Sequence, residues 1–239
     1  MYNSTLFIMI LVIIVNTCIN LVLSSSSKKP WDPVPQYIPT YQSKHQQLLN
    51  QTKQFGKKIQ IVFLGDSIIE NWLNNGKKVW QQFYEKRQSY NYGIGGDLTQ
   101  HILWRIDNGE LDGLQPKLLV LLVGTNNVAN HDKPVDVGKA MQLILKKLLT
   151  KLSNVKIILM SVFPRGGQKD DQQVDEINEI IKKNSDNSKV FFLEVTKKFR
   201  TNVGQLIEKL YMPDKLHLSE EGYKMWQKIM QPMFDKLLK

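Results

Sequence analysis

The sequence has few of the residues on which several protein classes depend. Only one of its 239 residues is a cysteine, Cys18, so the chain beyond it has neither a disulfide framework nor a thiolate metal cluster. No lysine or arginine precedes Lys28, and the basic start of an ordinary signal peptide is therefore missing. The histidines also lack the spacing of metal ligands, and we expect no metal and no cofactor; those considered are His45, His101 and His131.

Acidic residues are in the minority. Lysine and arginine number 32 against 22 aspartates and glutamates, which gives a formal net charge of +10. Such a charge can serve binding to nucleic acid or to an anionic membrane. The lysines come as scattered pairs mixed with acids, such as Lys57-Lys58 and Lys182-Lys183, and no aromatic residues are interleaved with them. This pattern predicts a solvated basic surface and no nucleic-acid partner.

One long apolar run lies near the N-terminus. Residues 6–23 are almost wholly apolar and carry no charged side chain. The run is longer than the apolar core of a signal peptide, roughly 7 to 15 residues, and falls within the range of about 17 to 25 that spans a bilayer. Residues 1–27 therefore predict an apolar helix that acts as a retained membrane anchor, with a cleaved signal segment as the alternative. The positive-inside rule and a secretory interpretation give opposite orientations for the rest of the chain.

The sequence after this run predicts a linker followed by one domain. Four serines at 24–27 and the repeated prolines after them mark an extended linker, assigned to residues 28–40, with the folded unit beginning near Trp31. A hydrophobic content of 42% suits one domain with a sizeable core over residues 41–239.

Apolar runs and helical patterns alternate through this domain. Short strands are predicted over residues 58–64, 89–92, 118–123, 155–162 and 190–195. Helices are predicted over residues 41–55, 67–74, 98–108, 135–151, 172–184 and 219–238. The strands alternate with helices, and three of them are near-continuous apolar runs, which indicates a parallel sheet covered on both sides. We therefore expect an α/β fold, a three-layer αβα sandwich around a five-stranded parallel sheet in flavodoxin-like order.

A serine, an aspartate and a histidine stand where a nucleophilic site can form. Ser67 follows a buried strand directly, in Gly65-Asp66-Ser67, at the sheet edge where ligands of such folds bind. Asp214 and His217 lie three residues apart, a spacing that allows the carboxylate to reach one imidazole nitrogen while the other faces a serine. Ser219 is a plausible N-cap that would fix His217 at a helix entrance. The predicted catalytic set is Ser67, Asp214 and His217.

Two glycine-containing turns follow the second and third predicted strands. Gly93-Ile94-Gly95-Gly96-Asp97 lacks the third glycine of a dinucleotide fingerprint, because Leu98 occupies that position. Glycine does leave backbone N–H groups accessible to a ligand. The N–H groups of Ser67 and Gly96 and the side-chain amide of Asn126 are therefore the expected donors of an oxyanion hole.

Together these blocks resemble a known family. Gly65-Asp66-Ser67, Gly93-Ile94-Gly95-Gly96-Asp97, Gly124-Thr125-Asn126-Asn127 and Asp214-x-x-His217 occur in the order and spacing of the GDSL/SGNH hydrolases. Within that family the chain most resembles the catalytic subunits of intracellular platelet-activating factor acetylhydrolase type Ib. The likeness runs from about Trp31 to the C-terminus and extends through Pro164-Arg165-Gly166 and Leu216-His217-Leu218.

The resemblance implies an SGNH hydrolase fold and a serine esterase that forms an acyl-enzyme. It assigns Ser67 as nucleophile, His217 as base and Asp214 as its orienting group. It also places Ile68, Thr125 and Leu216 around a narrow acyl pocket, which implies short, acetyl-type esters of lipids or small molecules. That family is soluble, cytosolic and dimeric, so the apolar run at residues 6–23 is a departure from it.

Other interpretations remain open for the whole chain and for single residues. The domain could be a membrane-anchored accessory subunit of a larger, possibly mitochondrial, membrane complex, or a carbohydrate O-acetyl esterase. Expected partners are an ester or lipid substrate, a membrane bound through the N-terminal segment, and a second copy or a membrane assembly. The expected location is an endomembrane, secretory or mitochondrial inner membrane, or outside the cell after cleavage. Ser67 and Asn126 could instead cap a helix or turn, and His217 could be a surface residue; for Asp97 we expect an N-cap and for Arg165 a structural salt bridge.

Overall fold

The structure is a computed structural model that describes residues 29–239. Five strands form its sheet, each four or five residues long. They are β1 (Ile61–Gly65), β2 (Ser89–Gly93), β3 (Leu118–Leu122), β4 (Lys156–Met160) and β5 (Val190–Leu193). Each coincides with a predicted strand to within a few residues: β1 begins later than predicted because Lys58 lies in a short 3-10 turn, and β2 runs to Gly93, just past its predicted end.

The sheet is parallel throughout, in the order β2-β1-β3-β4-β5. This confirms the predicted five-stranded parallel sheet and its flavodoxin-like order. β1 lies between β2 and β3, in register from Ile61 beside Ser89 and Leu118. Residues that follow these three strands therefore meet at one edge of the sheet.

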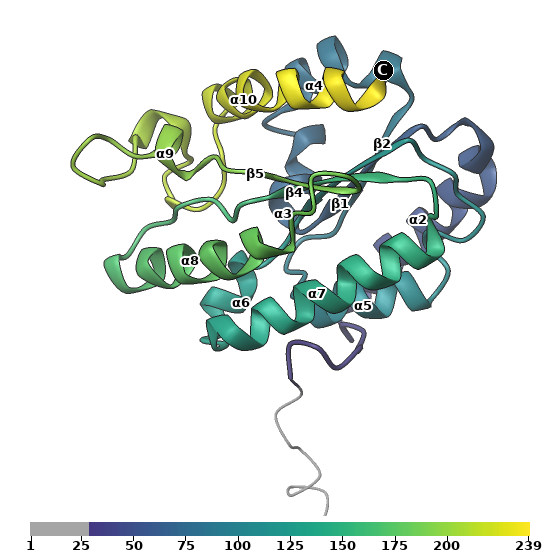
Figure 1. Cartoon of the computed structure of the whole chain (residues 1–239), viewed down its shortest axis with the longest axis horizontal. Helices are drawn as coiled ribbons and strands as arrows, with labels where there is room; N and C mark the ends of the chain where they lie inside the picture. Colours follow the sequence, from purple (N-terminus) through teal and green to yellow (C-terminus); the bar gives the residue numbers. More distant parts are fainter. Residues whose placement is uncertain (1–28) are drawn as a thin grey trace, which may run out of the picture.

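Both faces of the sheet are covered, as Figure 1 shows. Alternate residues of β1 enter different cores, since strand side chains point to opposite faces in turn: Val62 and Leu64 join one, and Ile61 and Phe63 the other. Helices α5 (Thr99–Asp107), α7 (Pro134–Lys151) and α8 (Gln168–Ile181) lie on the first face, and α4 (Lys77–Phe83) and α10 (Glu220–Leu238) on the second. The expected three-layer arrangement is therefore present.

The helices confirm the long predictions and add short ones. The long helices are α2 (Pro39–Phe55), α5 (Thr99–Asp107), α7 (Pro134–Lys151), α8 (Gln168–Ile181) and α10 (Glu220–Leu238). The helix expected over residues 67–74 divides into α3 (Ser67–Glu70) and a 3-10 turn, η2 (Asn71–Leu73). Three helices were not predicted from the sequence: α4 (Lys77–Phe83), α6 (Thr125–Ala129) and α9 (Thr196–Phe199).

The segment before α2, here called the N-terminal strap (residues 29–38), lies against the domain. The Thr99 hydroxyl donates to the Pro30 carbonyl at 2.9 Å, and the Lys139 ammonium sits 3.6 Å from the centre of the Trp31 ring. This part of the expected linker is thus packed on α5 and α7. The predicted apolar helix and Cys18 lie outside the described residues. Among residues 29–239, no helix combines the length and apolar character needed to cross a membrane.

Candidate active site

The turn after β1 places a serine hydroxyl at the sheet edge. A β-carbon added at Gly65 would lie 2.0 Å from the Leu122 carbonyl oxygen of β3, so only glycine fits where the strands approach. Asp66 is the N-cap of α3, and its side chain accepts a hydrogen bond from the Ile68 N–H at 2.9 Å. The capping role considered for Ser67 is therefore filled by Asp66. The hydroxyl of Ser67, the first residue of α3, is left available.

The second loop carries the aspartate and the histidine. One carboxylate oxygen of Asp214 accepts from the backbone N–H groups of Leu216 and His217, each at 2.9 Å. Lys215 within this turn has φ +54°, and its carbonyl accepts from Gly166 N–H at 2.9 Å. Ser219 then caps α10, since its hydroxyl accepts from Gly222 N–H, as predicted. The turn is thus held on both sides.

The two loops join the three predicted side chains in one hydrogen-bonded line. His217 Nε2 lies 2.9 Å from Ser67 Oγ, and His217 Nδ1 lies 2.7 Å from Asp214 Oδ2. The pKa of Asp214 is lowered: its limited burial acts to raise it, but the His217 ring and two backbone N–H groups outweigh that effect. An ionised Asp214 fixes the imidazole tautomer that bears its proton on Nδ1 and leaves Nε2 free to accept from the serine.

The three expected oxyanion donors each have an N–H group to offer. The N–H groups of Ser67 and Gly96 have no acceptor within residues 29–239, and Gly96 has φ +78°, a conformation that glycine adopts without strain. Asn126 donates one side-chain N–H to the Asp97 carbonyl at 2.9 Å. Its amide has a second N–H, so each expected oxyanion donor keeps one group for a ligand.

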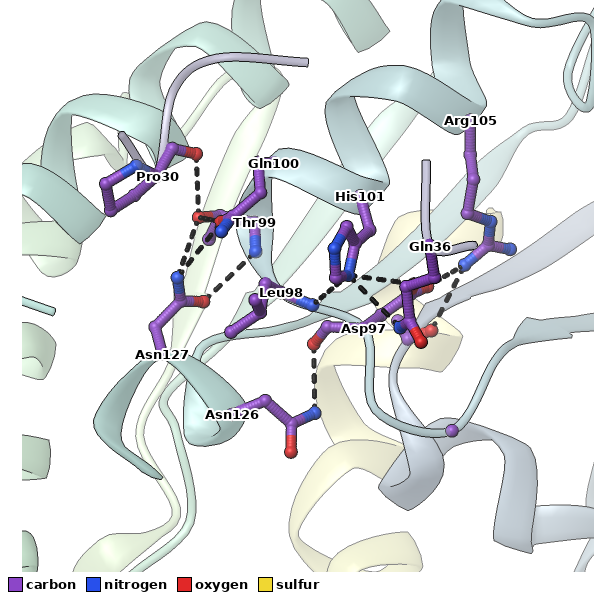
Figure 2. A network of polar contacts seen from close by, with 12 residues as sticks. Pro30, Gln36, Asp97, Leu98, Thr99, Gln100, His101, Arg105, Asn126 and Asn127 are labelled. Carbon is purple, nitrogen blue, oxygen red and sulfur yellow. Dashed lines mark hydrogen bonds and ion pairs between the residues drawn. The ribbon is translucent and has the colours of Figure 1, made fainter. Parts of the chain in front are cut away.

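A single buried guanidinium, that of Arg105 on α5, holds these donors in place (Figure 2). It donates to the Gly65 carbonyl, two residues before Ser67, and to the Tyr92 carbonyl at the end of β2. It also pairs with the carboxyl of Asp97, next to Gly96, and with Glu110 at 2.7 Å. The Ser67 turn, the Gly96 turn and, through Asp97, the Asn126 amide are all tied to this one side chain.

The prediction that Asp97 caps the following helix is wrong. Leu98 is the N-cap residue of α5, and the buried Asp97 side chain contacts Arg105 instead. Burial raises the pKa of Asp97 to about 8, against the opposing effect of Arg105. Burial also acts to raise the pKa of Glu110, but Arg105 and His45 reverse the shift and the pKa lies below its ordinary value.

The expected acyl-pocket residues flank the serine and the histidine. Ile68 and Thr125 are almost fully buried, at 1% and 2% exposure, and Leu216 is half-buried. Arg165 donates to the Thr125 carbonyl at 2.7 Å and to its hydroxyl at 3.3 Å, and its Nε lies 3.4 Å from Asp170. The predicted ion pair of Arg165 is present, and the same side chain fixes Thr125.

Several residues at this edge escaped the sequence analysis. Gln36 of the strap lies 3.1 Å from His101 Nδ1, and Glu70 accepts from the Gly95 N–H at 2.8 Å. Nothing local in the sequence marks these two. Arg105 did carry a signal, because a charged residue interrupts the apolar stripe of Ile102 and Ile106. Across residues 29–239 no three potential ligands gather to hold a metal ion.

Comparison with known proteins places this arrangement in context. A sequence profile of the GDSL-like lipase/acylhydrolase family matches residues 63–225. Platelet-activating factor acetylhydrolase IB subunit alpha1 of Rattus norvegicus is 33% identical over 171 residues, which cover 70% of this chain and 71% of that protein.

Solved structures show the same fold. A GDSL-like lipase from Bacteroides thetaiotaomicron superposes with a TM-score of 0.69 at 19% identity, over 80% of this chain and 97% of the other. An acetylxylan esterase from Geobacillus stearothermophilus superposes with a TM-score of 0.60 at 15% identity, over 74% and 94%. At such identities the likeness concerns the fold alone.

Proposed function

Because this chain belongs to the GDSL-like lipase/acylhydrolase family and is a carboxylic ester hydrolase, we propose that it cleaves short-acyl esters of lipids or small molecules with Ser67 as nucleophile. The observation that carries the proposal is the line from Ser67 Oγ to His217 Nε2 at 2.9 Å and from His217 Nδ1 to Asp214 at 2.7 Å. This is the geometry in which an imidazole takes a proton from a serine.

The reaction proceeds by acyl transfer in two steps. His217 takes the proton of Ser67 as the oxygen attacks the ester carbonyl, and the negative charge develops on an oxygen that faces Gly96 and Asn126. Each such donor is typically worth about 3 to 4 kcal/mol of the barrier. His217 then gives the proton to the leaving alcohol. A water molecule repeats the cycle on the acyl-enzyme and releases the acid.

The acyl group is short in this proposal. Ile68 and Thr125 are buried, and Arg165 donates a hydrogen bond to the Thr125 carbonyl. Neither side chain can therefore move easily to make room for a long acyl chain. Leu216, which is half-buried, is the wall that substitution can open. Replacing Leu216 with Ala should shift the preferred acyl group from acetyl toward butyryl or hexanoyl. Leu143→Ala, at a half-buried position on α7, should leave the preference unchanged.

The direct test measures hydrolysis of 4-nitrophenyl esters from acetyl to octanoyl by the wild type and by Ser67→Ala. Ser188→Ala, at an exposed serine, is the matched control. We expect the wild type and the control to hydrolyse acetyl esters fastest, and Ser67→Ala to lose at least about 10³-fold in kcat. Equal rates for all three proteins would refute the esterase proposal and favour an accessory structural role. A wild-type preference for octanoyl esters would refute the short acyl pocket. Acetylated xylo-oligosaccharides, added as substrates, test the alternative of a carbohydrate esterase.

The location of the enzyme is a separate proposal that rests on the apolar sequence of residues 6–23. We infer that this segment inserts into a membrane. It then either stays as an anchor or is removed by cleavage. Carbonate extraction of membranes, followed by N-terminal sequencing, distinguishes these cases. Release of the full-length chain into the soluble fraction would contradict membrane attachment.

A further inference from the structure

A cavity of about 470 Å³ lies beside the candidate oxyanion hole. One side is built by the N-terminal strap and the start of α2, including Gln36, Ile38 and Ser43, and the other by Glu70, Ile94 and Gly95. Residues 36–47 lie before the part of the chain that the family profile matches, which begins at residue 63. This wall therefore lies outside the matched profile.

The cavity adjoins the reacting serine. A β-carbon added at Gly95 would lie 3.8 Å from Ser67 Cβ and 3.3 Å from Glu70 Oε2, so this cavity-lining residue lies beside the nucleophile. At Gly96 an added β-carbon would lie 3.5 Å from Gln36 Nε2, which places that side chain beside an oxyanion donor. Gly95, which lines the cavity, is thus the residue directly before the expected oxyanion donor Gly96.

Sheet order decides which part of an ester the cavity would receive. Ser67 follows β1, which lies between β2 and β3; Thr125 follows β3, and Gly95 follows β2 on the opposite side. With its carbonyl oxygen in the oxyanion hole, an ester carries its acyl group to one side of Ser67 and its alcohol to the other. In the proposed acyl pocket Thr125 contacts the acyl group, on the side of β3. The alcohol then lies on the side of β2, where the cavity is found.

We propose that this cavity, lined by the N-terminal strap and α2, is the subsite for the leaving alcohol of a neutral ester, and this proposal rests on the proposed esterase function. Its apolar lining comes from Ile38 and Ile94, and polar atoms come from Gln36. Gln36 is held in position: its amide donates to Nδ1 of His101, whose pKa burial lowers to about 4, so that the ring is neutral and accepts.

The charged side chains that line the cavity are paired with each other, and this indicates the class of alcohol that fits. Lys44 pairs with Glu70 at 3.0 Å, and Glu70 also accepts from the Gly95 N–H. No unpaired charge is left among the lining residues to attract a phosphate or an ammonium group. A partly apolar alcohol without net charge fits this lining.

The experiment fills the cavity while the acyl group stays constant. Ser43→Trp places an indole at an exposed lining position of α2, and Gln46→Trp, at an exposed position of the same helix outside the lining, is the matched control. The kcat/KM values for ethyl acetate and 2-naphthyl acetate are measured for the full chain. Both esters give the same acetyl-enzyme, so any difference between them reports the alcohol.

We expect Ser43→Trp to lose at least tenfold in kcat/KM for 2-naphthyl acetate and less than twofold for ethyl acetate, with both values unchanged in Gln46→Trp. Equal losses for the two esters, or no loss for either, would overturn the subsite. A wild type that hydrolyses acetylcholine faster than its uncharged analogue 3,3-dimethylbutyl acetate would overturn the neutral alcohol. Failure of esterase activity itself is seen separately, as ethyl acetate rates that do not differ between wild type and Ser67→Ala.

Discussion

Replacing Arg105 with Met should strongly destabilise the protein. The side chain is fully buried and makes hydrogen bonds to two backbone carbonyls and to the carboxyl groups of Asp97 and Glu110. Methionine has a similar length but no donor. Removing one partner of a buried ion pair costs about 3 to 5 kcal/mol, because the other charge stays buried without compensation. For a chain of this size that corresponds to a fall in Tm of roughly 6 to 20 °C.

The matched control is the same substitution at the surface. Arg87 pairs with Asp235 at 2.5 Å, with side chains 39% and 44% exposed. Exposed pairs contribute only about 0 to 1 kcal/mol, so Arg87→Met should lower the Tm by a few degrees at most. Urea unfolding of both variants measures the two costs directly. Equal costs would refute the argument that the buried charges set the stability of this region.

A double substitution tests the physical cause. If the cost of Arg105→Met comes from carboxyl groups left without a cation, then Glu110→Gln should destabilise the wild type but recover about 1 to 2 kcal/mol in the Arg105→Met background. The effects of the two changes would then be strongly non-additive. Simple addition of the two costs would show that lost packing, and not charge, explains the effect.

Catalysis should respond to the milder Arg105→Lys. Lysine keeps the charge but cannot match the planar fork that reaches several acceptors at once. We expect kcat to fall by about ten- to a hundredfold while KM changes little, since loss of a whole oxyanion donor costs about 10² to 10³-fold. Steady-state kinetics at a temperature where the variant is folded measure this. An unchanged kcat would show that the donors do not depend on the guanidinium.

Three further predictions follow from single contacts. Asp214→Asn should lower kcat by about 10³ to 10⁴-fold through the wrong imidazole tautomer with little change in Tm, because an amide oxygen can still accept from Leu216 and His217 N–H; a large fall in Tm would contradict this. Gly65→Ala should lower the free energy of unfolding by roughly 3 kcal/mol or more, since its β-carbon would lie 2.0 Å from the Leu122 carbonyl oxygen. The control Gly56→Ala should change it by no more than about 1 kcal/mol, because its β-carbon would lie 3.4 Å from the nearest atom and its φ is −44°. Burial raises the pKa of Asp66 to about 7, so between about pH 4 and 7 the native state holds a proton that the unfolded chain has lost. The free energy of unfolding of the wild type should therefore fall relative to that of Asp66→Asn as the pH rises through that window. Parallel plots of unfolding free energy against pH for the two proteins would refute the shift.

The sequence predicted those parts of the fold and site that local patterns encode. Near-continuous apolar runs marked three of the five strands, and the Gly-Asp-Ser block indicated where the first one ends. His217 was located through its spacing from Asp214 and through the cap at Ser219, which needs only neighbouring residues. The short helices α4, α6 and α9 escaped because seven, five and four residues are too few to display a helical period.

Contacts between distant segments could not be predicted in this way. Residues 33–39 are rich in proline and suggested only a linker, yet Gln36 reaches His101 and the cavity beside Gly95. Asp97 has the residue type and position of an N-cap, but its carboxyl group bonds to the guanidinium of Arg105 instead of to the start of α5. In both cases the deciding partner comes from another element, and only the assembled sheet edge brings the two together.

The two sides of the site are held by different forces, and their variants should therefore behave differently. The expected oxyanion donors lie beside a buried charge cluster around Arg105, which also joins β1, β2 and α5. The acid-base side is an exposed loop held by backbone contacts and by the Ser219 cap. Substitutions in the cluster should consequently lower stability and kcat together, whereas Asp214→Asn should lower kcat alone. If Arg105→Lys and Asp214→Asn affected Tm and kcat in the same proportion, this division between the two sides would be wrong.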